Sequence, residues 1–162
     1  MQKRLATSML IALTCLPMVC AHATTDLERV AIERTLNAFT DAWNKHDAKE
    51  FSAVFTEDAE FTNVAGVSAV GRKAVEDFHA PRFATHFKDS NQVITRSKVK
   101  FIKPDVAAVD AWWEMTGART PSGQNAGVRR GILSFVMVKV QDQWQVAVMH
   151  NTNLTAPSPG SQ

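Results

Sequence analysis

The sequence lacks several features that mark large protein classes. Its 162 residues include no tyrosine and two cysteines, and 18 basic residues nearly balance 16 acidic ones. The formal charge of +2 gives little reason to expect a nucleic-acid site, and the one basic run, at residues 96–103, is expected to be a solvated strand face. The absence of a glycine-rich phosphate loop and of a nucleophile elbow disfavours nucleotide binding and serine hydrolase chemistry. With 45% hydrophobic and 21% charged residues, the chain has the composition of one globular domain.

The first 23 residues have the pattern of a secretory signal peptide. A positively charged start precedes an apolar run at residues 10–20, and residues 21–23 read Ala-His-Ala, the small-x-small pattern that signal peptidase recognises. The run is too short to be a stable membrane anchor. We therefore expect export to the periplasm or the medium, with cleavage after residue 23. In the alternative, Cys20 carries a lipid anchor, although the residue before it is Val19, where that pathway prefers a small side chain.

Cleavage at this point would remove both cysteines, Cys15 and Cys20, together with Lys3 and Arg4. The mature chain is then formally neutral and forms no disulfide in an oxidising compartment, so its stability must come from the core alone. The expected division is a signal peptide at residues 1–23, one domain at residues 24–154 and a disordered tail at residues 155–162.

Helical patterns dominate the first half of the mature chain. Thr25 and Glu28 have the spacing of a capping box, and apolar residues recur at helical spacing after them. Further along, Pro81 lacks a backbone donor and predicts a kink or a restart of its helix just after His79. The expected elements are helices over residues 25–45, from about residue 47 and from about residue 72, with a strand over residues 59–64.

Alternating patterns dominate the second half. Strands are expected over residues 93–101, 106–116, 128–140 and 144–152, with a polar loop over residues 117–127. Helices followed by a meander of long strands predict an α+β domain with its helices on one sheet face. A strongly bent, mostly antiparallel sheet wrapped around three helices encloses a cone with an open mouth.

Several segments resemble one known superfamily. Residues 42–47 (AWNKHD) and 55–61 (FTEDAEF) resemble the opening of the nuclear transport factor 2-like, or cystatin-like, superfamily. Residues 71–75 (GRKAV) resemble its third-helix start, and residues 144–146 (WQV) before 150–152 (HNT) its closing strand. Within it, the chain is similar to SnoaL-like proteins of the SgcJ/EcaC type, which are related in fold to ketosteroid isomerases and polyketide cyclases. The resemblance implies the cone-shaped fold and a pocket between helices and sheet.

The absence of tyrosine limits the activity that this resemblance implies. Ketosteroid isomerases use an aspartate base with a tyrosine and a protonated aspartate as donors, so that route is disfavoured here. Two functions stay open. One is acid/base isomerase, cyclase or lyase chemistry on a small apolar molecule, without a metal or a cofactor. The other is a non-catalytic ligand-binding or association module, expected to form a homodimer through the outer sheet face.

His150 is the best candidate for a general base. Alternation along the last strand places it on one face with Trp144, Val146 and Val148, at the end of an apolar stripe. Such an imidazole could act as a base or hydrogen-bond a substrate. It could equally be a core histidine bonded to a backbone carbonyl.

Asp110 is the candidate acidic partner. It shares a strand face with Trp112 and Glu114. If this face lines the cone, Asp110 is a pocket carboxylate beside an aromatic wall. If it is the outer face, which the apolar residues on the other side of the strand favour, Asp110 is solvated or ion-paired.

Five further residues are candidate ligand contacts: His79, Phe83, Asn63, Trp112 and Arg130. His79 either bonds a carbonyl that Pro81 leaves free or points into the pocket. Asn63 could orient a ligand or simply end a turn. One of two consecutive arginines should point inward, and Arg130 could meet Asp110 or an anionic ligand, or form a cross-strand ion pair. No compact metal-ligand spacing occurs, so we expect no metal site.

Overall fold

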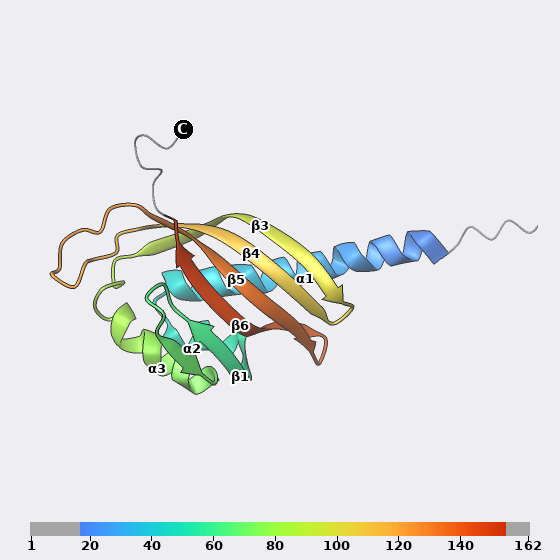
Figure 1. Cartoon of the computed structure of the whole chain (residues 1–162), viewed down its shortest axis with the longest axis horizontal. Helices are drawn as coiled ribbons and strands as arrows, with labels where there is room; N and C mark the ends of the chain where they lie inside the picture. The colour runs from blue at the N-terminus through green and yellow to red at the C-terminus, as the bar shows by residue number, and fades with distance from the viewer. Residues whose placement is uncertain (1–16, 155–162) are drawn as a thin grey trace, which may run out of the picture.

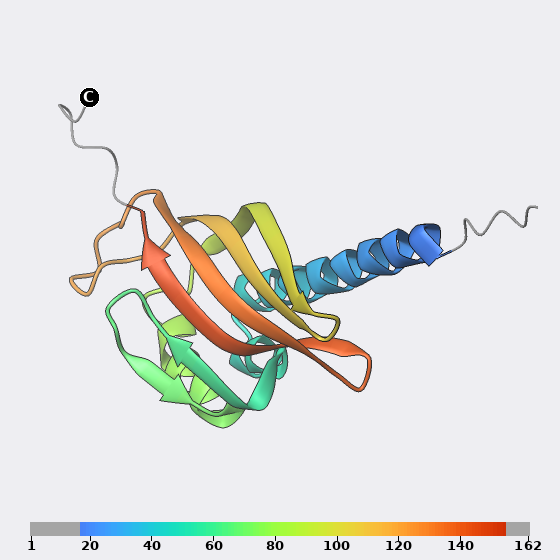
Figure 2. The same ribbon diagram turned by 45° about the vertical axis from the view of Figure 1, so that its right-hand side comes forward.

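A curved six-stranded sheet wraps around three helices in the computed structural model, which describes residues 17–154, with side chains from residue 25 onward (Figures 1 and 2). The helices are α1 (Pro17–Asn44), α2 (Ala48–Ala53) and α3 (Arg72–Phe83). The strands are β1 (Phe55–Thr62), β2 (Ser68–Val70), β3 (Asn91–Lys103), β4 (Val106–Thr116), β5 (Arg129–Val140) and β6 (Gln143–Asn153). This architecture confirms the α+β prediction.

The sheet has the strand order β2-β1-β6-β5-β4-β3. Only the β1–β6 pair is parallel among the described strands, and it joins the long strand of the helical first half to the last strand of the chain. The helices lie against the concave side of the sheet (Figure 2). The core therefore fills the space between the inward helix faces and the inner sheet face.

The start of the first helix differs from the sequence prediction. α1 begins at Pro17, and Thr25 lies inside the helix instead of capping it. No glycine or proline separates Pro17 from Thr25, so nothing in the chain stops the helix from extending upstream. Glu28 instead accepts hydrogen bonds from Lys139 Nζ, at 2.8 Å, and from Trp144 Nε1, at 2.7 Å.

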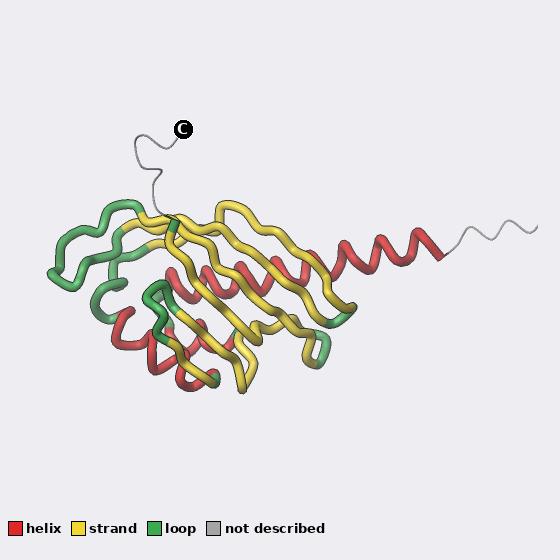
Figure 3. Tube along the Cα trace, viewed as in Figure 1, coloured by secondary structure: helices red, strands yellow, loops and turns green. Residues whose placement is uncertain are grey.

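The first turns of α1 extend beyond the sheet (Figure 3). The helix passes through residue 23, where cleavage is expected, and that cleavage stays a prediction. Residues 1–16 of the predicted signal peptide and the predicted tail at residues 155–162 lie outside the described residues. Within residues 17–154, no helix combines the length and the apolar character needed to cross a bilayer.

The second helix begins where the sequence predicts. Asp47 caps it, since Oδ1 accepts hydrogen bonds from the backbone N–H of Lys49 at 2.9 Å and of Glu50 at 2.8 Å. The short helix buries Phe51, whose ring centre lies 4.7 Å from that of Phe39 on α1. This aromatic contact joins the first two helices in the core.

The third helix continues through its proline. α3 includes Pro81 and ends at Phe83, so of the two expected outcomes the restart after His79 is wrong, while the kink stays a prediction. The missing N–H of Pro81 removes one bond to the carbonyl of Asp77, close enough to the helix end that the helix tolerates the loss. His79 and Arg82, three positions apart, therefore stay on one helix face.

The fourth strand alternates as its sequence suggests. Ala107, Val109, Ala111, Trp113 and Met115 are all buried. The intervening residues face outward, so the outer-face interpretation of Asp110, Trp112 and Glu114 is confirmed and the pocket interpretation is wrong. The physical reason is that the more apolar set of side chains covers the helices.

The last strand does not alternate throughout. Val136 pairs with Val148 but Met137 pairs with Val146, which leaves Ala147 as an extra residue in β6. Such a β-bulge reverses the facing of every later side chain. Trp144 and Val146 are therefore buried before the bulge and Met149 after it. The bulge turns His150 to the outer face, and the expected stripe ending in His150 is wrong.

Candidate functional site

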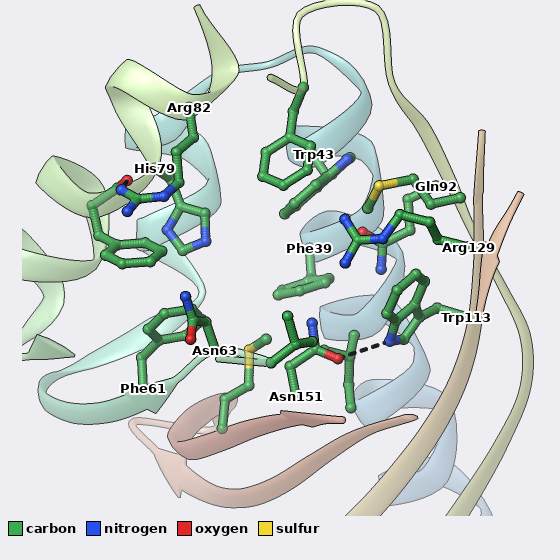
Figure 4. A pocket seen from close by; sticks show the side chains of 16 residues that line it. Phe39, Trp43, Phe61, Asn63, His79, Arg82, Gln92, Trp113, Arg129 and Asn151 are labelled. Atoms are coloured by element: carbon green, nitrogen blue, oxygen red, sulfur yellow. Dashed lines mark hydrogen bonds between the residues drawn. The ribbon is translucent and has the colours of Figure 1, made fainter. Parts of the chain in front are cut away.

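A cavity of about 90 Å³ lies at the open end of the cone, between α1, α3 and the inner sheet face (Figure 4). Its aromatic wall consists of Phe39, Trp43, Phe61, Phe78, Phe87 and Trp113. Its polar lining residues are Asn63, His79, Arg82, Gln92, Arg129 and Asn151. A closed cavity of roughly 150 Å³ accepts a benzene molecule. This cavity is smaller but open to solvent, so a larger ligand would place one end inside and extend out through the mouth.

His79 is the central polar group of this cavity. Its side chain comes from α3, is 3% exposed and faces the cavity (Figure 4). Nδ1 lies 2.7 Å from the carbonyl oxygen of Val75. A carbonyl only accepts hydrogen bonds, so Nδ1 carries the proton and Nε2 carries the lone pair. No described residue hydrogen-bonds Nε2, and the ring is packed by Phe51, at 4.3 Å, and Phe61, at 5.0 Å, between ring centres.

The surroundings of His79 keep it neutral. Burial lowers its pKa from the ordinary 6.5 to about 4, against the hydrogen bond to Val75, which favours the charged form. The charge of Arg82, one helical turn away, adds to the lowering. At neutral pH the cavity therefore contains an uncharged imidazole with a fixed tautomer and an available lone pair.

Two asparagines present amide donors to the cavity. Asn151 Oδ1 accepts a hydrogen bond from Trp113 Nε1 at 3.0 Å (dashed in Figure 4). Asn63 Oδ1 accepts from the backbone N–H of Ala65 at 2.8 Å and of Val67 at 2.9 Å, which closes the turn between β1 and β2. Because each oxygen already accepts hydrogen bonds from N–H groups, each side-chain NH₂ remains available as a donor beside the cavity.

Glycine at position 131 allows the Trp113 ring to reach Asn151. A Cβ there would lie 2.4 Å from the Trp113 ring and 2.4 Å from the carbonyl oxygen of Thr152. Both distances are far shorter than a van der Waals contact. Any larger residue at Gly131 would therefore displace the indole that forms one wall of the cavity.

The end of α1 is tied to the start of β3 at the cavity mouth. Asn44 Nδ2 donates to the carbonyl of Gln92 at 2.9 Å, and the N–H of Gln92 donates to Asn44 Oδ1 at 2.7 Å. Trp43 Nε1 donates to Ser90 Oγ at 3.1 Å. These bonds hold Trp43 and Gln92 in place on the cavity wall.

The two predicted catalytic residues do not lie at this cavity. His150 is exposed on the outer sheet face, and Asp110 is half-buried on the same face. Ser134 of β5 stands between them in register, and its Oγ donates to Asp110 Oδ1 at 2.8 Å. The structure therefore brings neither residue to the pocket.

The predicted ligand contacts divide between the two sheet faces. His79 and Asn63 line the cavity, although a role in binding stays a prediction. Phe83 is buried behind the cavity wall, with its ring centre 5.0 Å from that of Trp43. Trp112 lies on the outer face under Arg96, and Arg130 pairs with Glu114 at 2.9 Å there. These positions exclude Trp112 and Arg130 from the cavity.

Sequence reasoning missed several cavity residues. The inward-pointing arginine is Arg129 instead of Arg130, because odd-numbered positions of β5 face the helices. Arg82 could have been found from its three-residue spacing to His79 on one helix. Asn151 could not have been found, because the bulge at Ala147 that turns it inward has no signature in the sequence nearby. In residues 17–154, no cluster of three or more His, Cys, Asp or Glu side chains could hold a metal ion.

A cone of helices and bent sheet with a cavity at its open end defines the cystatin-like, or nuclear transport factor 2-like, class of fold. The chain belongs to the SnoaL-like domain family, whose model matches residues 36–144. This finding confirms the superfamily and the family predicted from the sequence.

Solved structures support the same fold. An uncharacterised cystatin-like protein from Caulobacter vibrioides is 25% identical, with a TM-score of 0.73 over 78% of this chain and 89% of that chain. A candidate scytalone dehydratase from Novosphingobium aromaticivorans is 22% identical, with a TM-score of 0.74 over 83% and 89%. LinA is 13% identical, with a TM-score of 0.76 over 83% and 91%. No curated protein matches the chain.

Proposed function

We propose that the protein binds a small, largely apolar molecule in this cavity and catalyses its isomerisation or elimination, with His79 as the general base. The observation that carries the proposal is the neutral imidazole inside an aromatic cavity, with Nδ1 fixed as a donor to Val75. The lone pair of Nε2 is the one basic group that the described lining residues offer to a substrate, because no Asp, Glu or Lys is among them.

The proposed reaction begins with a proton transfer from carbon. Nε2 of His79 takes the proton, the C–H electron pair moves toward an adjacent carbonyl, and an enolate oxygen develops. In this proposal the amide N–H groups of Asn63 and Asn151, which line the same cavity, donate to that oxygen. The imidazolium then returns the proton to another carbon in isomerisation, or to a departing hydroxyl in elimination. Negative charge on the enolate stabilises the imidazolium, which offsets the low pKa of the empty site.

The relatives support this class of reaction without fixing the substrate. One similar structure carries the name of a dehydratase, an enzyme class that eliminates water. The alternative expected from the sequence, an inert association module, predicts a cavity without a perturbed ionisable group. The low pKa of the buried His79 favours catalysis over that alternative.

The test uses 5-nitrobenzisoxazole, a neutral aromatic probe that opens to a coloured phenolate when a base removes its C–H proton. We expect saturable elimination by the wild type and a loss of about 10²-fold or more in His79→Gln, which removes the base. The matched control is His150→Gln, which changes an exposed histidine on the outer face and should keep the wild-type rate.

Two results would contradict the proposal. Equal rates in the wild type and His79→Gln would remove His79 from the chemistry. Quenching of Trp43 and Trp113 fluorescence by the probe without any elimination would indicate a binding module instead, since both indoles line the cavity. Circular dichroism would establish that His79→Gln is folded.

Export and self-association complete the proposal. Export rests on the sequence pattern of residues 1–23. A homodimer through the outer sheet face is supported by half-buried apolar side chains there, namely Ile132, Val136 and Val148 on neighbouring strands. Such an interface would leave the cavity open, because the cavity lies on the opposite face of the sheet.

A further inference from the structure

The cavity has an unbalanced charge. Its described lining residues include two guanidinium groups, Arg82 and Arg129, and no carboxylate. Ion pairs do form elsewhere on the described surface, for example between Arg130 and Glu114 and between Arg119 and Asp89. Within residues 25–154, neither cavity arginine has a carboxylate oxygen within 4.0 Å. The molecule therefore holds two positive charges at one apolar cavity without compensating them.

Arg129 reaches the cavity from the sheet. Its side chain is half-buried, and its guanidinium lies 5.8 Å from the centre of the Trp113 ring. Nη2 donates to Asn153 Oδ1 at 3.2 Å, a neutral acceptor. Burial without a counter-charge lowers the pKa of Arg129, which means that its charged form is poorly solvated here. An anion in the cavity would relieve that cost.

Arg82 approaches from the opposite side. It comes from α3 while Arg129 comes from β5. Arg129 extends into the cavity, whereas the Arg82 guanidinium lies beside His79 at the facing wall (Figure 4). Its guanidinium lies 3.6 Å from the centre of the Phe78 ring, and Nη1 donates to the carbonyl of Phe78. This packing holds the guanidinium beside His79 and leaves other N–H groups unused.

From this arrangement we infer that the ligand is a small carboxylic acid, whose carboxylate lies between Arg82 and Arg129 and whose apolar body enters among the aromatic rings. The inference rests on the proposed function, because it identifies the end of the substrate that anchors it beside His79. Planar guanidinium groups match a carboxylate through paired hydrogen bonds. A cavity of about 90 Å³ with an aromatic wall suits a compact acid better than a highly hydrated dianion.

The test compares binding of acids with that of their neutral amides. Benzoate and cyclohexanecarboxylate would be titrated by calorimetry against benzamide and cyclohexanecarboxamide, with inorganic phosphate as an anion that lacks an apolar body. The variants are Arg82→Gln and Arg129→Gln. The matched control is Arg130→Gln, which changes the neighbouring arginine on the outer face.

We expect the wild type to bind an acid at least about 10-fold more tightly than its amide, in line with the strength of hydrogen bonds to charged groups. Arg82→Gln and Arg129→Gln should each lose most of that preference, and Arg130→Gln should keep it. The inference is overturned if no acid binds better than its amide, if phosphate binds as tightly as the acids, or if Arg130→Gln loses as much as Arg129→Gln.

Failure of this inference and failure of the proposed function have different signatures. If amides bind as well as acids while elimination of the neutral probe still depends on His79, the carboxylate inference is wrong and His79 is retained as the general base. If acids bind through the arginines while elimination does not depend on His79, the role of His79 as general base is wrong and the carboxylate site is retained.

Discussion

Replacing the cavity histidine should change how the stability of the protein depends on pH. Burial lowers the pKa of His79 from 6.5 to about 4 in the folded chain. Between these two values the unfolded chain binds a proton at this position and the folded chain does not, so acid favours unfolding. The stability linked to neutral His79 is therefore complete above about pH 6.5 and is lost as the pH falls toward about 4.

The structure sets the size of this effect. A difference of about 2.5 in pKa corresponds to about 3–4 kcal/mol in full, since each pKa unit is worth about 1.4 kcal/mol. About 3 kcal/mol of this is lost by pH 4, where the folded His79 is half protonated. His79 is 3% exposed, so water does little to screen the penalty of charging it. Well below about pH 4 both states bind the proton, and the difference should change no further.

The measurement is urea unfolding of the wild type and His79→Gln from pH 7 to pH 4. Carboxylates and the other histidines titrate in both proteins, so the difference between the two free energies of unfolding isolates His79. We expect the cost of His79→Gln to be about 3 kcal/mol smaller at pH 4 than at pH 7. His150→Gln should follow the wild type at every pH. Parallel curves for wild type and His79→Gln would refute the buried, neutral imidazole.

Two further predictions concern the cavity wall and the outer face. Gly131→Ala should destabilise the protein by about 1–3 kcal/mol and alter tryptophan fluorescence, because the added Cβ lies 2.4 Å from the Trp113 ring; unchanged thermal unfolding would contradict the close packing. Val136→Asp should convert the proposed homodimer to a monomer in light scattering while binding at the cavity is retained, because the substitution places a charge on the outer sheet face. A wild type that is monomeric at high concentration would count against the dimer.

The sequence predicts much of the fold because the fold follows repeated apolar spacing. The cap at Asp47 and the alternation of residues 106–116 depend on contacts close in the chain or on the apolar content of one strand face. Helices and strands with local patterns of this kind can be predicted from the sequence without knowledge of the tertiary structure. The start of α1 differs from the predicted one because a capping pattern at Thr25 does not prevent a helix from extending upstream.

The site is harder to predict because it depends on the facing of single residues. The bulge at Ala147 arises from how β6 pairs with its neighbours, and it exchanges the inner and outer positions of His150 and Asn151. In the same way, a shift of one residue decides whether Arg129 or Arg130 faces the cavity. For His79 the sequence leaves two orientations open, and the structure combines them: the ring lines the cavity while Nδ1 bonds a carbonyl, although that carbonyl belongs to Val75 and is not the one that Pro81 leaves free.

The central claim is that the cavity holds a neutral histidine whose Nε2 is free to accept a proton. Long-range ¹H–¹⁵N NMR of the imidazoles tests it most directly, with His79→Gln assigning the His79 signals. At pH 7 we expect the His79 ring to show a protonated Nδ1 and an unprotonated Nε2, as the bond to Val75 requires. A proton on Nε2, or an imidazolium at that pH, would contradict the proposed base.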